Sequence, residues 1–170
     1  STVKLLVNEG PSYMRTARNK VPRIYDDQSK LNLEIGIGSM LEEGNDVAII
    51  ACGVMVEQAR IASSTLSHEG INCAVVDMHT IKPLDTELVS KLADQCGCFV
   101  TAEDHSVICG LGSALAEWLS SNKPKPLEMV GVRDRFGESG GTEELMEKLG
   151  LTSDAICMAA RTSINRKKST

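Results

Sequence analysis

Three consecutive polar residues, Glu103, Asp104 and His105, form the densest group in this 170-residue sequence whose types suit chemistry. A carboxylate beside an imidazole can orient the ring or tune its pKa, as general acid–base catalysis requires. The triplet has no nucleophile and no metal-binding partner at a suitable spacing. We therefore favour a hydrogen-bonded loop or an interface contact over catalysis for these residues.

Two arginines, Arg15 and Arg18, flank Thr16 and Ala17. A guanidinium group can donate paired hydrogen bonds to phosphate oxygens. Two arginines at the end of a strand would therefore suit a sugar-phosphate substrate. Surface arginines on a linker explain the same pattern equally well.

Three glycine-containing segments are weaker candidates for a site. Residues 51–54 form a strand-to-helix turn whose N–H groups could hold an anion. Neither this turn nor residues 109–112 has the G-x-G-x-x-G spacing of a dinucleotide site, and tight entry into a helix explains the second one. Residues 133–141 alternate positive and negative charges, so we expect internal salt bridges closing onto a neighbouring domain rather than substrate capture.

The elements that must position these residues follow from the apolar pattern. Short β-branched runs predict buried strands at residues 46–53, 73–78, 98–102 and 127–132. Apolar residues at helical spacing predict helices at 54–68, from 85 or 86 onward and at 112–121, and two short helices from 142 and 153. Residues 103–110 are expected to be a loop. The alternation predicts an α/β fold, a three-layer αβα sandwich on a mostly parallel five-stranded sheet.

The first 45 residues do not share this alternation. Residues 10–16 are compatible with one strand, and the turn-rich, polar stretch that follows is typical of a connection between domains. We expect residues 1–25 to be the terminal segment of a preceding domain, residues 26–45 to be a linker, and residues 46–170 to be a complete α/β domain.

Composition excludes several classes of partner. The chain has 18 Lys and Arg against 23 Asp and Glu, a net charge of −5, with no concentrated basic face for nucleic acid or an anionic membrane. No apolar run approaches the roughly 20 residues that span a bilayer. The six cysteines have no C-x-x-C spacing, so we expect buried, reduced thiols and a cytoplasmic protein.

An ordered set of sequence blocks resembles the C-terminal part of transketolases. It begins with G-P-S-Y-M-R-T-A-R-N at residues 10–19 and I-I-A-C-G at 49–53, and continues with T-I-K-P-L-D at 80–85. V-T-A-E-D-H follows at 100–105, then G-L-G-S-A at 110–114 and D-R-F-G-E-S-G at 134–140. The last block is most similar to the C-terminal subunit of split transketolases, in which the enzyme is encoded as two shorter chains.

This resemblance implies a thiamine diphosphate enzyme that moves a two-carbon ketol unit between sugar phosphates. In that family the cofactor binds with Mg²⁺ or Ca²⁺ between pyrophosphate-binding and pyrimidine-binding domains, at a dimer interface. The resemblance assigns residues 1–25 to the end of the pyrimidine-binding domain. It makes the missing domains or subunit the expected partners, in a homodimer of the complete enzyme.

The resemblance carries one site residue over to this chain. Arg18 matches the second arginine of the family's R-x-x-R pattern and would contact the substrate phosphate. Glu103 and His105 match positions that are structural or interfacial in the family. The family's G-D-G motif is not in this sequence, and its cofactor-activating glutamate lies upstream of it. We therefore expect no catalytic residue, no bound cofactor or metal and no activity in this chain alone.

Related proteins leave alternatives open. Two other groups of enzymes share the domain: the β subunits of 2-oxoacid dehydrogenases and the deoxyxylulose-phosphate synthases. The β subunits would use it to dock a lipoyl acyltransferase. A free-standing nucleotide or anion sensor is a further alternative. The residue sequences of the blocks at 80–85 and 134–140 favour transketolase over these relatives.

Overall fold

A five-stranded sheet forms the centre of the molecule in the computed structural model, which describes residues 9–17, 21, 23–25 and 34–169. The strand order is β1-β3-β2-β4-β5. The β2–β3, β2–β4 and β4–β5 pairs are parallel, whereas β1 pairs antiparallel with β3 at one edge. The strands span Ser39–Glu42 (β1), Val47–Ala51 (β2), Cys73–Asp77 (β3), Phe99–Ser106 (β4) and Leu127–Val132 (β5). The predicted mostly parallel sheet of five strands is confirmed.

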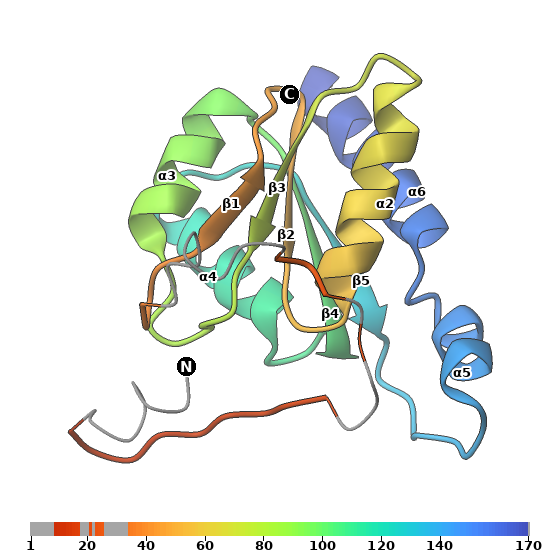
Figure 1. Cartoon of the computed structure of the whole chain (residues 1–170). Helices are drawn as coiled ribbons and strands as arrows, with labels where there is room; N and C mark the ends of the chain where they lie inside the picture. The colour runs from red at the N-terminus through yellow and green to blue at the C-terminus, as the bar shows by residue number, and fades with distance from the viewer. Residues whose placement is uncertain (1–8, 18–20, 22, 26–33, 170) are drawn as a thin grey trace.

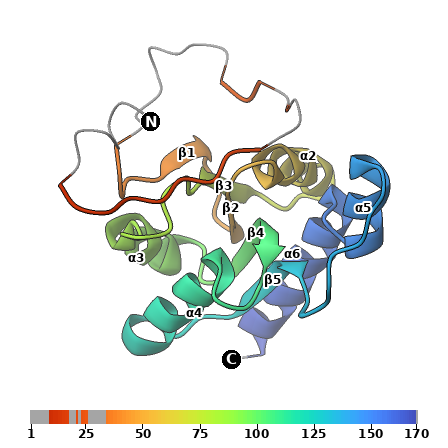
Figure 2. The ribbon, with the colours of Figure 1, turned by 90° about the horizontal axis from the view of Figure 1, so that it is seen from below.

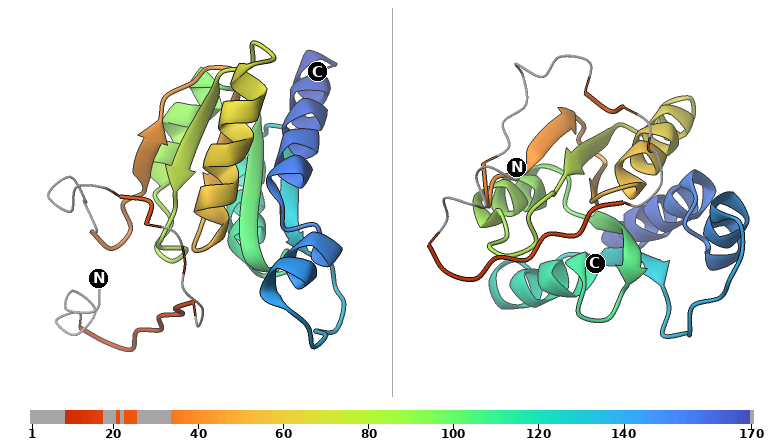
Figure 3. Two further views of the ribbon diagram at one scale, coloured as in Figure 1. Left: turned by 45° about the vertical axis from the view of Figure 1, so that its right-hand side comes forward. Right: turned by 60° about the horizontal axis from the view of Figure 1, so that its bottom comes forward.

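Helices cover both faces of this sheet (Figure 1). Apolar residues of α2 and α6 pack in one core cluster, and those of α3 and α4 pack in a second cluster on the other side of the strands. The α/β sandwich of three layers is therefore confirmed, and the two further views separate its layers clearly (Figure 3). The helices span Met55–Ser67 (α2), Thr86–Gln95 (α3), Leu111–Asn122 (α4), Thr142–Leu149 (α5) and Ser153–Lys168 (α6).

The central strand β2 shows why the strands of this sheet have continuous apolar sequences. Ile49 packs in the cluster of α2 and α6, whereas its neighbours Ala48 and Ile50 pack in the cluster of α3 and α4. All three side chains are fully buried. Because helices cover both faces, a strand here has no polar face, and its side chains do not alternate between apolar and polar.

The structure corrects three details of the predicted elements. Strand β4 continues to Ser106, so the Glu103, Asp104 and His105 triplet lies on a strand and not in a loop. Ser106 pairs with Val132 of β5 after an irregularity in register, which explains the extension. The last helix, α6, has 16 residues and is not short. Strand β1 lies within the 26–45 range that we expected to be a linker, and it is part of the sheet.

Residues 9–17 form neither a helix nor a strand in the structure, contrary to the strand expected at 10–16. A strand needs a second strand to pair with, and none of the strands in the described sheet pairs with this segment. The segment runs beneath the carboxyl ends of the parallel strands (Figures 1 and 2). Within the described residues, no helix is both long enough and apolar enough to cross a membrane.

The cysteines are free thiols. Four of them are buried, and Cys52 is partly buried, as small hydrophobic residues would be. Cys109 departs from the expectation, because it is exposed on the connection between β4 and α4 and has a left-handed backbone (φ 60°). Its neighbours in sequence, Ile108 and Gly110, belong to the same turn.

Candidate functional site

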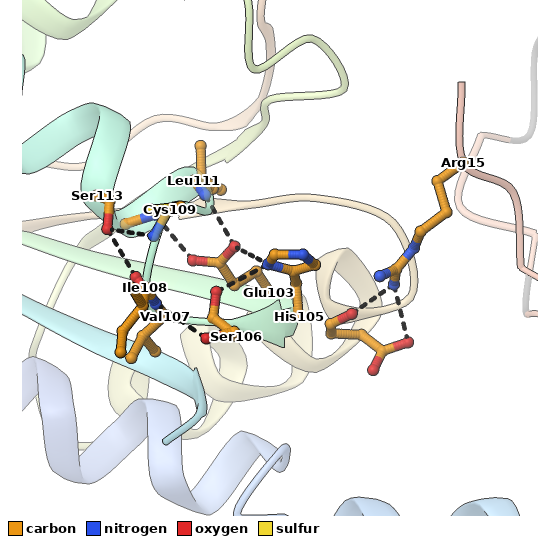
Figure 4. A network of polar contacts seen from close by, with 11 residues as sticks. Arg15, Glu103, His105, Ser106, Val107, Ile108, Cys109, Leu111 and Ser113 are labelled. Atoms are coloured by element: carbon orange, nitrogen blue, oxygen red, sulfur yellow. Dashed lines mark hydrogen bonds and ion pairs between the residues drawn. The ribbon is translucent and has the colours of Figure 1, made fainter. Parts of the chain in front are cut away.

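The carboxylate of Glu103 joins the end of β4 to the start of α4. Its side chain is fully buried, and its two oxygens accept hydrogen bonds from the backbone N–H groups of Leu111 and Gly112, each at 2.8 Å. The first N–H groups of a helix have no partner within the helix, and the helix dipole favours a negative charge there. Glu103 therefore acts as the cap of α4 (Figure 4).

His105 and Ser113 complete the polar contacts of this turn. The Nδ1 atom of His105 lies 2.8 Å from the carbonyl oxygen of Ser106 and 3.8 Å from Oε2 of Glu103. The Ser113 hydroxyl donates to the carbonyl of Val107 and accepts from the N–H of Cys109. The polar side chains of the turn thus hold its backbone, which agrees with the hydrogen-bonded interpretation of the triplet rather than with acid–base catalysis.

Asp104 faces a different element. The Nη2 atom of Arg15 donates hydrogen bonds to the main-chain carbonyl of Asp104 and to its Oδ2 atom, the latter at 3.3 Å. Both side chains are about half exposed. Figure 4 shows Arg15 approaching β4 from the side opposite Ser113. Arg18, the predicted phosphate ligand, lies outside the described residues.

A second carboxylate, Asp77, lies at the carboxyl end of β3 and was not singled out by the sequence analysis. Burial raises its pKa, and the hydroxyl of Tyr25, which donates to Oδ2 at 2.7 Å, acts in the opposite direction. Tyr25 precedes the sheet by more than ten residues, so this bond attaches a residue before the sheet to the end of β3. The only feature of the sequence that could have indicated this pair is the acidic residue, Asp77, at the end of an apolar strand.

In the turn at residues 51–54, one of the N–H groups that could have held an anion is already in use. The N–H of Cys52 donates to Ala102, and the N–H groups of Met55 and Val56 donate to carbonyls within the turn. Burial, followed by the negative charges of Glu103 and Asp77, raises the pKa of the Cys52 thiol to about 12. This shift disfavours the thiolate, which is the nucleophilic form of a cysteine.

The loop at residues 133–141 contains an internal salt bridge, as we expected, and a second salt bridge joins it to α5. The carboxylate of Glu138 accepts from Arg135 at 2.5 Å and from Lys148 of α5. These two cations hold the pKa of Glu138 below its usual range. In the same loop, next to Arg135, the ring of Phe136 is 97% exposed. The loop thus exposes an aromatic side chain on a backbone that salt bridges hold in place.

A comparison with protein families matches residues 36–156 to the family described as transketolase, C-terminal domain. The chain belongs to this family. The matched range begins just before β1 and ends in the first turn of α6, so it covers the whole sheet and helices α2 to α5.

Relatives extend the match towards the N-terminus. The chain is 46% identical over 164 residues to the 6-deoxy-6-sulfo-D-fructose transketolase subunit SqwH of Clostridium sp. (strain MSTE9), covering 96% of this chain and 50% of the relative. It is 35% identical to 1-deoxy-D-xylulose-5-phosphate synthase 1 of Geobacter sulfurreducens, covering 94% of this chain and 25% of the synthase. The chain spans about half the length of the first relative and a quarter of the length of the synthase.

A solved structure supports the same assignment. The chain superposes with a TM-score of 0.84 and 45% identity on a protein described as "Split gene transketolase, inactive beta4 tetramer". The match covers 88% of this chain and 48% of that one. Fold and sequence thus agree on a split-transketolase relative.

Proposed function

We propose that this chain is the C-terminal portion of a thiamine diphosphate-dependent transketolase, which transfers a ketol unit between sugar phosphates. The observation that carries the proposal is the 45–46% identity to split transketolase subunits over nearly the whole chain. In this proposal the domain is structural and stabilises the dimer of the complete enzyme. It has no activity alone.

The residues of this chain do not fit a thiamine diphosphate site. The described residues include no cluster of three or more His, Cys, Asp or Glu that could hold a metal ion. The sequence also contains no G-D-G motif. Thiamine diphosphate and its Mg²⁺ or Ca²⁺ would therefore be held by the pyrophosphate- and pyrimidine-binding parts of the enzyme.

Exposed aromatic residues indicate where those parts would bind. The chain has only five aromatic residues, and two of them, Tyr13 (88%) and Phe136 (97%), are almost fully exposed. Aromatic side chains are enriched in protein interfaces and depleted from free surfaces. Tyr13 lies on the segment beneath the carboxyl ends of the strands (Figure 2). We assign this side of the domain to the contact with the rest of the pyrimidine-binding part, of which residues 1–25 would be the terminal segment.

The free cysteines support a reducing compartment, and we propose a cytoplasmic protein without nucleic-acid or membrane partners. We keep the linker assignment only for residues 26–38, because β1 begins at Ser39.

Arg18 is proposed to bind the phosphate of the sugar substrate. The test uses the assembled enzyme, that is, this chain together with the pyrophosphate- and pyrimidine-binding domains. Arg18→Ala should raise KM for a phosphorylated ketose donor at least tenfold and leave KM for an unphosphorylated donor nearly unchanged. Arg23→Ala, at an exposed arginine five residues further along the chain, is the matched control. Equal effects of Arg18→Ala on both donors would refute the phosphate contact.

The synthase relative supports one alternative function, a deoxyxylulose-phosphate synthase domain. Donor choice in the assembled enzyme separates the two. A transketolase takes its ketol unit from xylulose 5-phosphate, whereas efficient use of pyruvate as the donor would favour the alternative and contradict our proposal.

A further inference from the structure

Strand β5 forms one edge of the sheet. Among the described strands it pairs with β4 alone, because it is the last in the order β1-β3-β2-β4-β5. Just before β5, the carbonyl of Pro126 accepts from the N–H of Phe99 on the β4 side. The backbone groups of successive residues point to opposite sides of a strand. The N–H and C=O groups of Leu127 and Met129 therefore point away from β4, at the edge of the sheet.

An edge of this kind can pair with a strand of another molecule. A row of unpaired N–H and C=O groups is a template for such pairing, and short edge strands and bulges are two ways in which proteins prevent it. The opposite edge has both features, since β1 has only four residues and its register with β3 shifts between Met40 and Glu42. β5 has six residues, so its edge needs a different protection.

Two arginines occupy the outward carbonyl groups of β5. The Nη1 atom of Arg166, on α6, donates to the carbonyl oxygen of Leu127 at 3.0 Å and to Oε1 of Glu128 at 2.7 Å. The Nη2 atom of Arg133, just after β5, donates to the carbonyl oxygen of Met129 at 3.3 Å. A strand that approached this edge would have to displace both guanidinium groups before it could pair with these carbonyls.

Charge adds to this steric protection. Arg133 and Arg166 are both exposed, and an arginine is always charged. If the β5 edges of two copies paired about a two-fold axis, the arginines of both copies would lie along one seam. Like charges that face each other across paired strands are destabilising. The two arginines thus oppose pairing with an identical edge in particular.

We propose that Arg133 and Arg166 close the β5 edge to strand pairing with a second copy of this chain. They keep the copies from associating through this edge, so that the other faces of the domain remain available for specific contacts. Both arginines act within the domain itself, and the test therefore needs no other part of the enzyme.

The test compares the chain with the double variant Arg133→Ala, Arg166→Ala by sedimentation velocity over a range of concentrations. We expect the association constant between copies to rise at least about tenfold in the double variant, because the outward carbonyls are then open. Circular dichroism should show the same fold as in the unaltered chain, since both arginines are exposed.

A control variant makes the same change in net charge. Arg161→Ala with Lys123→Ala also removes two cations, and these pair with Glu69 and Asp94 in other parts of the molecule. Its association constant should equal that of the unaltered chain. A general effect of the more negative net charge would instead appear in both double variants.

Hydrogen exchange locates the new contact. The N–H of Met129 points away from β4, so strand pairing at this edge would protect it from solvent. In the double variant, this amide should exchange at least about tenfold more slowly at high protein concentration than at low concentration. In the unaltered chain, its exchange rate should not depend on concentration.

Two results would overturn the proposal. One is a double variant that associates no more strongly than the control, or that associates without slower exchange at Met129. The other is concentration-dependent protection of this amide in the unaltered chain, because the edge would then already pair. If the double variant does not fold, Arg133→Ala and Arg166→Ala carry the same test singly, each with an expected increase of about threefold in the association constant.

Discussion

A Cβ atom at Gly110 would lie 2.0 Å from Oε2 of Glu103. The absence of a side chain at residue 110 is therefore what allows the buried carboxylate to reach the start of α4. The same Cβ would lie 2.7 Å from the carbonyl oxygen of Ser106. Since Glu103 and the backbone of β4 are both fixed, neither can move away cheaply.

Gly110→Ala should consequently destabilise the domain by about 2–4 kcal/mol, from overpacking and a displaced cap. The measurement is chemical denaturation followed by circular dichroism. Gly137→Ala is the matched control, because a Cβ there meets nothing within 4 Å, and it should change the free energy of unfolding by less than about 0.5 kcal/mol. Equal stability of the two variants would contradict the proposed fit.

Removal of the Glu103 carboxylate should have a graded effect. Glu103→Ala leaves the buried N–H groups of Leu111 and Gly112 without acceptors, at a cost of about 2–5 kcal/mol. Glu103→Gln keeps one oxygen acceptor and should cost less. Hydrogen exchange of the two amides, measured by NMR, should accelerate in the same order. Slow exchange of both amides in Glu103→Ala would show that the cap is dispensable.

Asp77 should titrate above the usual aspartate range. Burial raises its folded-state pKa, so the group favours the folded state at pH values below its unfolded pKa, and that contribution is lost as pH rises through the folded pKa. Because the hydrogen bond from Tyr25 lowers this pKa, Tyr25→Phe should raise it further. Carbon-detected NMR of the Asp77 carboxyl group provides the measurement. A lower pKa in Tyr25→Phe would contradict the assignment.

Phe136 should contribute to association and not to folding. Phe136→Ala should change the free energy of unfolding by less than about 0.5 kcal/mol, because the ring is 97% exposed. It should raise the Kd for the pyrophosphate- and pyrimidine-binding parts at least about tenfold, as expected of an aromatic anchor. Calorimetry measures both, with Ile61→Ala on α2 as a control for a partly exposed apolar residue. An unchanged Kd would remove Phe136 from the interface.

Much of the fold could be predicted from the sequence because its strands are buried on both faces. Residues such as Ile49 and Val75 lie in unbroken apolar runs that only a covered parallel sheet explains. The predicted start of a helix at residue 85 or 86 also has a local basis, because the side chain of Asp85 accepts from the N–H of Leu88 at 3.0 Å. Such features depend on neighbours in sequence and are visible without a structure.

The parts that escaped prediction depend on distant partners. Nothing near Glu103 in the sequence indicates that β4 continues through it, because the extension is set by pairing with Val132. The contact of Arg15 with Asp104 and the bond of Tyr25 to Asp77 each join residues more than 50 positions apart. The strand expected at residues 10–16 does not form, because none of the strands in the described sheet pairs with this segment.

The central claim is that this chain is the C-terminal portion of a transketolase and has no ketol transfer alone. Its most direct test is a coupled assay with xylulose 5-phosphate, thiamine diphosphate and Mg²⁺, applied to the purified chain and to the chain combined with the pyrophosphate- and pyrimidine-binding domains. The account predicts no turnover above background for the chain alone and clear ketol transfer for the combination. Measurable turnover by the chain alone, or none by a combination shown to assemble, would contradict it.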